Sequence, residues 1–389
     1  MRRLHLLLGL TGSLLAALPA LAQQPVKIGM ITTLSGPGGY LGQDIRDGFQ
    51  LAIDAEGGKL GGVPVQVIVE DDDLKPGQAK QIAERLIQNE KVKLFTGIVF
   101  SNVAGATVPD ILDAGDIYVS PNAAPSGFAG KDCNKNYFVV SWQNDALHEA
   151  GGQLATELGY KRAFILAPNY QAGKDALAGF KRYFKGEIVG EIYTKLDQTD
   201  FAAEMAQIRA ANPDMVFQFH PGGLGIAFMR QYQQAGLGAK IPMVVAEPSA
   251  DQVILNAVGE ASVGLAVAAH WNYDFDNPAN TKFVAAWKAK YNRPLTYYAA
   301  QGYDTGLAYA AALKATGGKI DDMEAFRLAL AKADFQSVRG AFKFGPNQHP
   351  IQDWYALRVE KGADGKPLLK TLRKIMSNQG DSYSAQCKL

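Results

Sequence analysis

Val26-Lys27-Ile28-Gly29-Met30-Ile31 is the first structured stretch of the chain, a short run rich in β-branched and apolar residues. A longer stretch of helical period follows Tyr40, and residues 63–69 form a second β-branched run. A strand, a helix and a second strand in this order predict a βαβ unit, whose strands lie parallel in one sheet. This opening stretch therefore predicts an α/β fold.

The alternation of strands and helices continues in two series. In the first, residues 78–90 place their apolar side chains on one stripe of a helix, and strands are expected at 92–98 and 117–119. The second series runs from residue 163 to residue 245. We therefore expect two doubly wound, mostly parallel sheets in one chain.

Three further helical patterns occupy residues 281–291, 298–314 and 323–332, with no clear strand between them. They are too few to build a third α/β domain, so we expect them to pack onto an existing lobe. Segments rich in Gly and Pro follow the predicted strands at 35–39, 121–125, 221–223 and 248–249. Such loops lie at the carboxyl ends of parallel strands, where open α/β sheets bind ligands.

Residues 1–22 have the features of a secretory signal peptide. Arg2 and Arg3 precede an apolar run over residues 6–18, and Ala20-Leu21-Ala22 is a small-x-small cleavage signal. The apolar run is too short to span a membrane. Cleavage near Ala22 would leave 37 basic against 38 acidic residues, because the 39 basic and 38 acidic residues of the full chain include two leader arginines and no leader acid. A net charge of −1 gives no basic footprint for nucleic acid.

Composition and motifs favour binding over catalysis. The 389 residues are 47% apolar and 20% charged, which excludes a disordered chain, a coiled coil and a polytopic membrane protein. There is no nucleophile elbow, zinc-protease motif, Walker A motif or C-x-x-C. Gly223-Leu224-Gly225 matches only part of a dinucleotide fingerprint, and the histidines are scattered. We expect no catalytic residue, metal or cofactor, and keep a secreted enzyme as the minor alternative.

Two smaller features carry predictions of their own. His148-Glu149 lacks the second histidine of a zinc motif, and we interpret it as part of a surface helix. Cys133 and Cys387 are the only cysteines, and an exported chain meets an oxidising compartment, so one disulfide between them is expected. Two free thiols are the alternative.

Several segments taken together resemble the branched-chain amino acid (Leu/Ile/Val) binding proteins of ABC importers, over nearly the whole mature chain. They are Val26-Lys27-Ile28-Gly29 with Leu34-Ser35-Gly36-Pro37, Glu70-Asp71-Asp72, Gly97 with Ser101, Ser120-Pro121-Asn122-Ala123-Ala124-Pro125, Asp200-Phe201, and residues 280–291 and 298–304. Residues 169–186, 339–344 and 349–353 are more similar to the subset that takes up aromatic carboxylates.

The resemblance implies a type I periplasmic binding protein: two lobes, three crossovers between them, and a ligand held in the cleft. The crossovers are expected near residues 143–146, 270–274 and 344–352. They assign residues 23–144 plus 272–346 to the N-terminal lobe and residues 145–271 plus 347–389 to the C-terminal lobe. The resemblance also implies a periplasmic monomer that delivers its ligand to an ABC permease in the inner membrane.

The resemblance places a carboxylate receptor where a helix begins near Asn102. Unpaired backbone N–H groups at that helix start and the Ser101 hydroxyl would hold the ligand carboxylate. The loop Asn122-Ala123-Ala124 resembles a ligand-contacting loop of the family but lacks its threonine and is one residue shorter. Ala172 stands where the family carries a tyrosine, which should open room in the cleft. A flat aromatic ligand would use that room, with the candidate stacking partners Tyr40, Phe100, Tyr170 and Tyr298.

Glu247 favours the opposite ligand class, because it matches the family acid that pairs with an amino acid's α-ammonium group. In an aromatic-acid binder it would accept a hydrogen bond from a ring hydroxyl or stay protonated, and it can also be an ordinary helix-start acid. His220, in the facing loop, is a candidate donor to a ligand oxygen or a satisfied loop histidine. We predict a small aromatic carboxylate of the hydroxycinnamate or benzoate type, with a branched-chain or other hydrophobic amino acid as the alternative.

Overall fold

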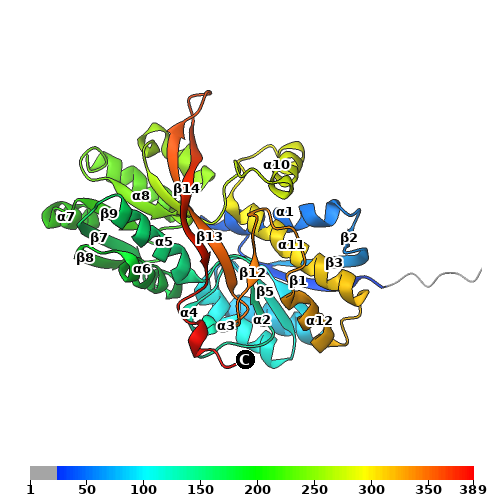
Figure 1. Ribbon diagram of the computed structural model, residues 1–389. Helices are drawn as coiled ribbons and strands as arrows, with labels where there is room; N and C mark the ends of the chain where they lie inside the picture. The colour runs from blue at the N-terminus through cyan, green and yellow to red at the C-terminus, as the bar shows by residue number, and fades with distance from the viewer. Residues whose placement is uncertain (1–23) are drawn as a thin grey trace, which may run out of the picture.

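The computed structural model describes residues 24–389, and the predicted signal peptide at 1–22 lies outside them. Figure 1 shows two halves, each built on its own sheet, with helices packed against the sheets. The prediction of two mostly parallel, doubly wound sheets is confirmed. Within residues 24–389 no helix is both long and apolar enough to cross a membrane.

The first sheet has six strands in the order β2-β3-β1-β4-β5-β6. All neighbours are parallel except β2, which pairs antiparallel with β3. The opening βαβ unit is β1, α1 and β3, with Val26 beside Val65 in the register. The elements of this half are β1 (Val26–Thr32), α1 (Gly39–Asp54), β2 (Lys59–Leu60), β3 (Val63–Asp71), α2 (Pro76–Gln88), β4 (Leu94–Thr96), α3 (Ser101–Asp113), β5 (Ile117–Ser120), α4 (Ser126–Ala129) and β6 (Tyr137–Val139).

The second sheet has the order β12-β13-β11-β10-β9-β7-β8, and β14 pairs with β13. Strands β7 to β11 are parallel, and a long antiparallel hairpin, β13 and β14, completes the edge beside β11. The strands are β7 (Arg162–Pro168), β8 (Glu187–Thr194), β9 (Met215–Gln218), β10 (Met243–Ala246), β11 (Ala266–Ala269), β12 (Lys343–Phe344), β13 (Pro350–Lys361) and β14 (Pro367–Gln379). The helices are α5 (Asn144–Glu157), α6 (Gln171–Tyr183), α7 (Ala202–Ala211), α8 (Gly223–Gln234), η1 (Glu247–Ser249), α9 (Gln252–Val258) and η2 (Gly259–Ser262).

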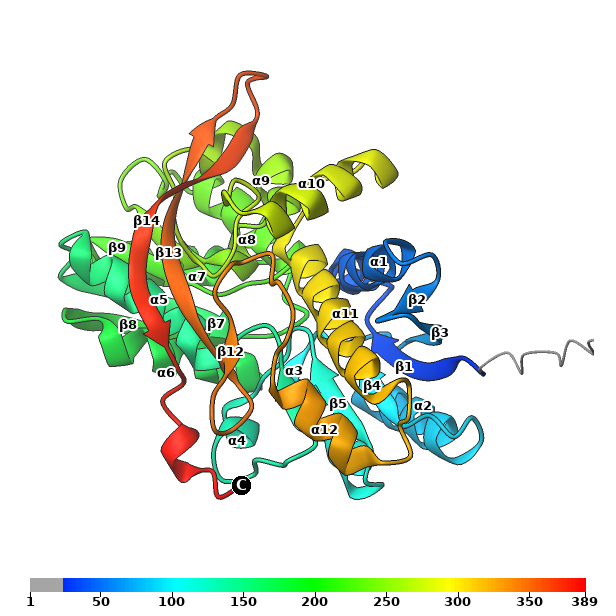
Figure 2. The same cartoon turned by 45° about the vertical axis from the view of Figure 1, so that its right-hand side comes forward.

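The three late helices are α10 (Pro278–Lys290), α11 (Tyr297–Thr316) and α12 (Met323–Ala331). Helix α11 lies along α1 of the first half, as both views show (Figures 1 and 2). The two helices approach closely because glycines face the partner backbone: a Cβ on Gly48 would lie 2.0 Å from the Ala299 carbonyl oxygen. The expectation that these helices pack onto an existing lobe is confirmed.

The chain passes between the halves three times: between β6 and α5, between β11 and α10, and between α12 and β13. A buried ion pair of Arg339 with Asp304 (3.2 Å) lies beside the first and third passages. The Arg339 guanidinium also donates to the Ser141 carbonyl at 2.8 Å and to Gln352 Oε1 at 2.7 Å. This network fixes two of the three connecting segments to each other.

The predicted disulfide between Cys133 and Cys387 is present, with Cα atoms 5.6 Å apart and a sequence separation of 254. It fastens the segment that follows β14, including η3 (Ser384–Gln386), to the loop after α4 of the first half.

The prediction of a surface helix at His148-Glu149 is wrong. His148 is 3% exposed and Glu149 is fully buried in α5. The C-terminal segment and α6 cover this helix: Ser382 donates to Glu149, and Arg182 forms ion pairs with Glu149 and Asp145. The missing second histidine excluded a zinc motif, but the absence of that motif does not predict which segments pack on the helix.

Candidate functional site

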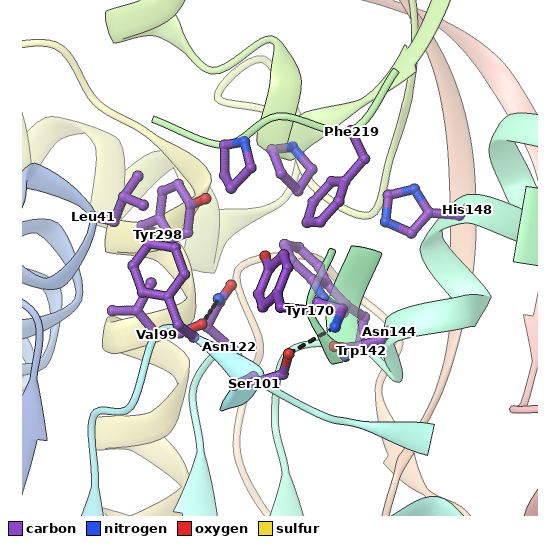
Figure 3. A pocket seen from close by; sticks show the side chains of 15 residues that line it. Leu41, Val99, Ser101, Asn122, Trp142, Asn144, His148, Tyr170, Phe219 and Tyr298 are labelled. Atoms are coloured by element: carbon purple, nitrogen blue, oxygen red, sulfur yellow. Dashed lines mark hydrogen bonds between the residues drawn. The ribbon is translucent and has the colours of Figure 1, made fainter. Parts of the chain in front are cut away.

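A cavity lies between the two halves, at the carboxyl ends of strands from both sheets (Figure 3). Its walls are Leu41, Val99, Phe100, Ser101, Asn122, Ala123, Trp142, Asn144, His148, Tyr170, Ala172, Phe219, Pro221, Pro248 and Tyr298.

Two helices begin at this cavity, α3 at Ser101 from the first half and α6 at Gln171 from the second. The first backbone N–H groups of a helix have no partner inside the helix, and the helix dipole makes this end electropositive. In the part of the chain that the structure describes, the N–H groups of Ser101 and Asn102 have no acceptor. The cavity therefore favours an anionic group at this end.

Ser101 links the two helix starts. Its Oγ accepts a hydrogen bond from the Ala172 N–H at 2.7 Å, drawn as a dashed line in Figure 3. A serine hydroxyl that accepts through its oxygen still carries one hydrogen to donate. Ser101 is 2% exposed, so that hydrogen requires an acceptor inside the cavity.

Aromatic rings form much of the remaining wall. Phe100 of the first half and Tyr170 of the second have ring centroids 6.4 Å apart with planes at 49°. The rings of Tyr170 and Phe219 are nearly parallel, with their centroids 6.2 Å apart and their planes at 11°. Burial raises the pKa of Tyr170 and of Tyr298, so both phenols stay neutral. These rings offer flat apolar surface to a planar ligand.

Polar side chains complete the wall. Asn144 is committed to the protein, because its Oδ1 accepts from the Ala124 N–H at 3.1 Å and its Nδ2 donates to Asp175 at 3.0 Å. Asn122 donates to the Val99 carbonyl at 2.7 Å, while its Oδ1 is buried without a partner.

The Nδ1 atom of His148 is also buried without a partner, and burial lowers the pKa of this imidazole to about 3. His148 is therefore neutral.

Seven of the residues predicted from sequence line the cavity: Phe100, Ser101, Asn122, Ala123, Tyr170, Ala172 and Tyr298. Sequence reasoning missed Trp142, Asn144 and His148, although they lie within the first predicted crossover or within two residues of it. Their place beside a crossover was the available signal, because the residues that flank a hinge face the cleft between the lobes.

Three predicted residues lie beside the cavity rather than in its wall. The Tyr40 hydroxyl donates to Asp251 of the second half at 2.6 Å. The Ala124 N–H donates to Asn144, and Asn102 faces a neighbouring opening between the halves together with Gln171. Tyr40 and Ala124 therefore support the cavity wall through these hydrogen bonds.

Glu247 and His220 are directed elsewhere. Glu247 is 2% exposed; its carboxyl accepts from the His270 backbone N–H at 3.1 Å and lies 2.6 Å from His270 Nδ1. Burial raises the pKa of Glu247 and lowers that of His270.

His220 follows Phe219, and neighbours along an extended chain point to opposite sides. Because Phe219 lines the cavity, His220 packs behind it, with its ring nitrogens 3.1 Å from Thr194 Oγ1 and 2.8 Å from Gln218 Oε1.

The two halves touch around the cavity. Besides the contacts of Ser101 and Tyr40, the Gly223 N–H donates to the Pro37 carbonyl at 3.2 Å, and Ser126 Oγ donates to Asp175 at 2.8 Å. Hydrogen bonds from one half to the other on several sides of one cavity define a closed cleft.

A chain of two α/β halves, joined by three connecting segments and closed over a small cavity, has the architecture of the two-lobed solute-binding proteins. Residues 25–366 match the periplasmic binding protein family, and the chain belongs to this family.

The relatives include binding proteins for two ligand classes. A Leu/Ile/Val-binding protein homolog of Brucella melitensis is 30% identical over 371 residues, which cover 92% of this chain and 93% of that protein. An R. palustris ABC transporter solute-binding protein, solved in complex with benzoate, is 32% identical with a TM-score of 0.89, over 94% of this chain and all of that one. A second R. palustris solute-binding protein, solved with 4-hydroxybenzoate, is 28% identical with a TM-score of 0.86, over 92% and 99% of the two chains.

Proposed function

We propose that this protein is the solute-binding component of an ABC importer and that it captures a small aromatic carboxylate of the benzoate or hydroxycinnamate type. One observation carries the proposal: the cavity pairs an anion-binding end, at the starts of α3 and α6, with a wall of aromatic rings. The ligand carboxylate binds at Ser101 and the backbone N–H groups beside it. The ring packs among Phe100, Tyr170 and Tyr298.

The acid–base character of the wall argues against an amino-acid ligand. An α-ammonium group held out of water needs an anionic or strongly accepting partner. No aspartate or glutamate is among the described residues that line the cavity. Glu247, the acid expected from the family pattern, accepts hydrogen bonds from the chain at His270 and Trp271 instead.

A branched-chain or other hydrophobic amino acid is the second candidate ligand. The similarity to the Leu/Ile/Val-binding protein homolog of B. melitensis favours it, because that relative covers nearly the whole chain. The Asn122 Oδ1 atom is one lining acceptor that could face an ammonium group, since it is buried without a partner, and the lone pair of the unpartnered His148 imidazole is another.

Delivery of the ligand to the permease would depend on closure of the two lobes around it. Lobes of residues 23–144 plus 272–346 and 145–271 plus 347–389 would open to admit the ligand and close around it. The ligand favours closure only to the extent that it binds the closed form better. The closed monomer would present both lobes to a permease in the inner membrane after export and cleavage near Ala22, and it would release the ligand chemically unchanged.

Thermal unfolding of the mature protein with a panel of benzoates, hydroxycinnamates and aliphatic amino acids tests this function. A ligand present at 100 times its Kd stabilises the folded protein by about 2.7 kcal/mol, which is a readily measured shift in Tm. We expect aromatic acids to raise the Tm and leucine and valine to leave it unchanged. A response to leucine or valine alone would reject the aromatic assignment, and turnover of the bound acid would reject a binding-only role.

A further inference from the structure

His148 is an unusual polar residue in the cavity wall. Figure 3 shows its side chain pointing from α5 toward the cavity, while Ser101 lies at the other side of the cavity, below Tyr170 in the view. Two phenylalanines pack edge-on against the imidazole ring. The ring centroid of Phe219 lies 4.9 Å from that of His148 with the planes at 70°, and that of Phe217 lies 5.6 Å away with the planes at 83°. The imidazole is thus fixed in orientation by packing.

No described residue forms a hydrogen bond with either ring nitrogen of His148, and Nδ1 is buried. The other three histidines of residues 24–389 each have a ring nitrogen within 3 Å of a protein oxygen: His220 with Gln218, His270 with Glu247 and His349 with the Asn347 carbonyl. A buried polar group without a partner costs about 1–3 kcal/mol. A bound ligand that reaches the imidazole would remove this cost.

The chemistry of a neutral imidazole selects the ligand group. Burial keeps His148 uncharged, so it offers one N–H donor and one nitrogen lone pair, not a cation for a carboxylate. A phenolic hydroxyl is both a donor and an acceptor, so it can pair with either ring nitrogen in either tautomer. A ring without a hydroxyl leaves the imidazole unpaired.

We propose that His148 selects hydroxylated aromatic carboxylates, by a hydrogen bond from its imidazole to a ring hydroxyl while the ligand carboxylate lies at Ser101. This inference rests on the proposed function and deepens it, because it names the ring substituent that the cavity recognises.

Calorimetric titration with benzoate, 3-hydroxybenzoate and 4-hydroxybenzoate tests the proposal on the wild-type protein first. One hydroxylated isomer should bind roughly tenfold or more tightly than benzoate, as expected for one buried hydrogen bond. The position of the favoured hydroxyl then gives the reach from Ser101 to His148. Equal or tighter binding of benzoate would overturn the proposal without a variant. If none of the three acids binds, the same comparison is made between cinnamate and 4-hydroxycinnamate, and failure of these two acids as well would overturn the proposed function instead.

The variants His148→Phe and His148→Leu carry the second test; having two of them guards against one failing to fold. In both variants the ratio of the benzoate Kd to the Kd of the favoured hydroxybenzoate should fall to about one, because only the hydroxyl loses its partner. An equal loss for all three acids would place His148 at the carboxylate or in the general shape of the cavity, and would overturn the proposal.

Tyr232→Phe is the matched control. Tyr232 is a buried residue of α8 in the same half whose hydroxyl donates to the Ile241 carbonyl at 2.8 Å, and it does not line the cavity. This substitution also removes a buried polar group, but the ratio of hydroxybenzoate to benzoate affinity should stay at the wild-type value. A changed ratio in Tyr232→Phe would show that any loss of packing alters selectivity, which would contradict a specific role for His148.

Discussion

Ser101 combines a hydrogen bond between the halves with a hydroxyl hydrogen that has no acceptor among the described residues, and its side chain lines the cavity. We predict that Ser101→Ala weakens binding of benzoate or a hydroxybenzoate by about 1–3 kcal/mol, because the carboxylate then loses a donor in a buried site. Calorimetric titration of the variant against wild type measures this loss. An unchanged Kd would remove Ser101 from the carboxylate site.

The variant Ser126→Ala distinguishes the two roles of Ser101, the hydrogen bond between the halves and the contact with the ligand carboxylate. Ser126 also joins the halves, through its hydroxyl to Asp175 at 2.8 Å, but it does not line the cavity. We expect a smaller loss of affinity in this variant than in Ser101→Ala. An equal loss would mean that Ser101 acts through closure alone.

His148 also makes stability depend on pH. Its pKa is lowered to about 3 by burial, whereas an unfolded histidine titrates near 6.5. Between these values the unfolded chain binds a proton that the folded chain does not, so His148 lowers stability progressively as the pH falls below about 6.5. We predict that His148→Phe gains stability relative to wild type between pH 7 and pH 5, by up to about 1.4 kcal/mol per pH unit.

Urea unfolding of the ligand-free proteins at both pH values checks this pH effect. Tyr232→Phe serves as the reference, because it changes no group that titrates in this range and its stability difference from wild type should be constant. A pH-independent difference for His148→Phe would contradict the neutral, buried state of the imidazole.

Sequence reasoning predicted residues well where local structure determines the role, and poorly where distant packing does. Ser101 was placed correctly in the cavity wall because the family pattern marks the helix start that follows this strand. Glu247 was predicted as a ligand residue from its position, but its role depends on His270, a contact across 23 residues. For His220, the alternation with Phe219 decides which side chain reaches the cavity, and the local sequence does not show which face is inside.

At the scale of elements, the packing of α11 on α1 depends on glycine. We predict that Gly48→Ala lowers the free energy of unfolding by about 1–3 kcal/mol, because the new Cβ would lie 2.0 Å from the Ala299 carbonyl oxygen and the helices must separate. Gly105→Ala in α3 is the control, since its Cβ meets no atom within 4 Å. This control should be neutral or up to about 1 kcal/mol more stable, from the better helix propensity of alanine.

Denaturant unfolding of both variants measures the difference. Equal stability of Gly48→Ala and Gly105→Ala would contradict the close approach of the two helices.

The sequence predicted elements best where a regular period is strong. The strands β1, β3 and β7 and the helices α2 and α11 follow from β-branched runs or an apolar stripe. Helix α5 was mispredicted because it is buried nearly all round, so polar residues such as Asp145 and Glu149 do not mark a solvent face. Strand β14 carries exposed Lys370, Arg373 and Lys374 and lacks a clear alternating pattern, so the β13–β14 hairpin was not resolved into its strands.

At the scale of the whole molecule, the disulfide joins the C-terminal segment of the second half to a loop of the first. We predict that Cys133→Ser with Cys387→Ser lowers the free energy of unfolding by about 2–5 kcal/mol, because a long closed loop in the unfolded chain is released. Denaturant titration of the double variant against oxidised wild type measures this loss, and reduced wild type should match the double variant. No difference between oxidised wild type and the double variant would contradict a structural role for the bond.

The central prediction concerns the closed cleft: an aromatic carboxylate should stabilise the closed arrangement of the two halves. Hydrogen bonds from Ser101, Tyr40, Ser126 and Gly223 join the halves around the cavity, and a ligand that binds the closed form better than the open one should favour closure further. Small-angle X-ray scattering of the mature protein measures closure directly as a decrease in the radius of gyration. We predict this decrease on addition of saturating benzoate or hydroxybenzoate and none on addition of leucine; compaction by leucine alone, or no compaction by any aromatic acid, would contradict the claim.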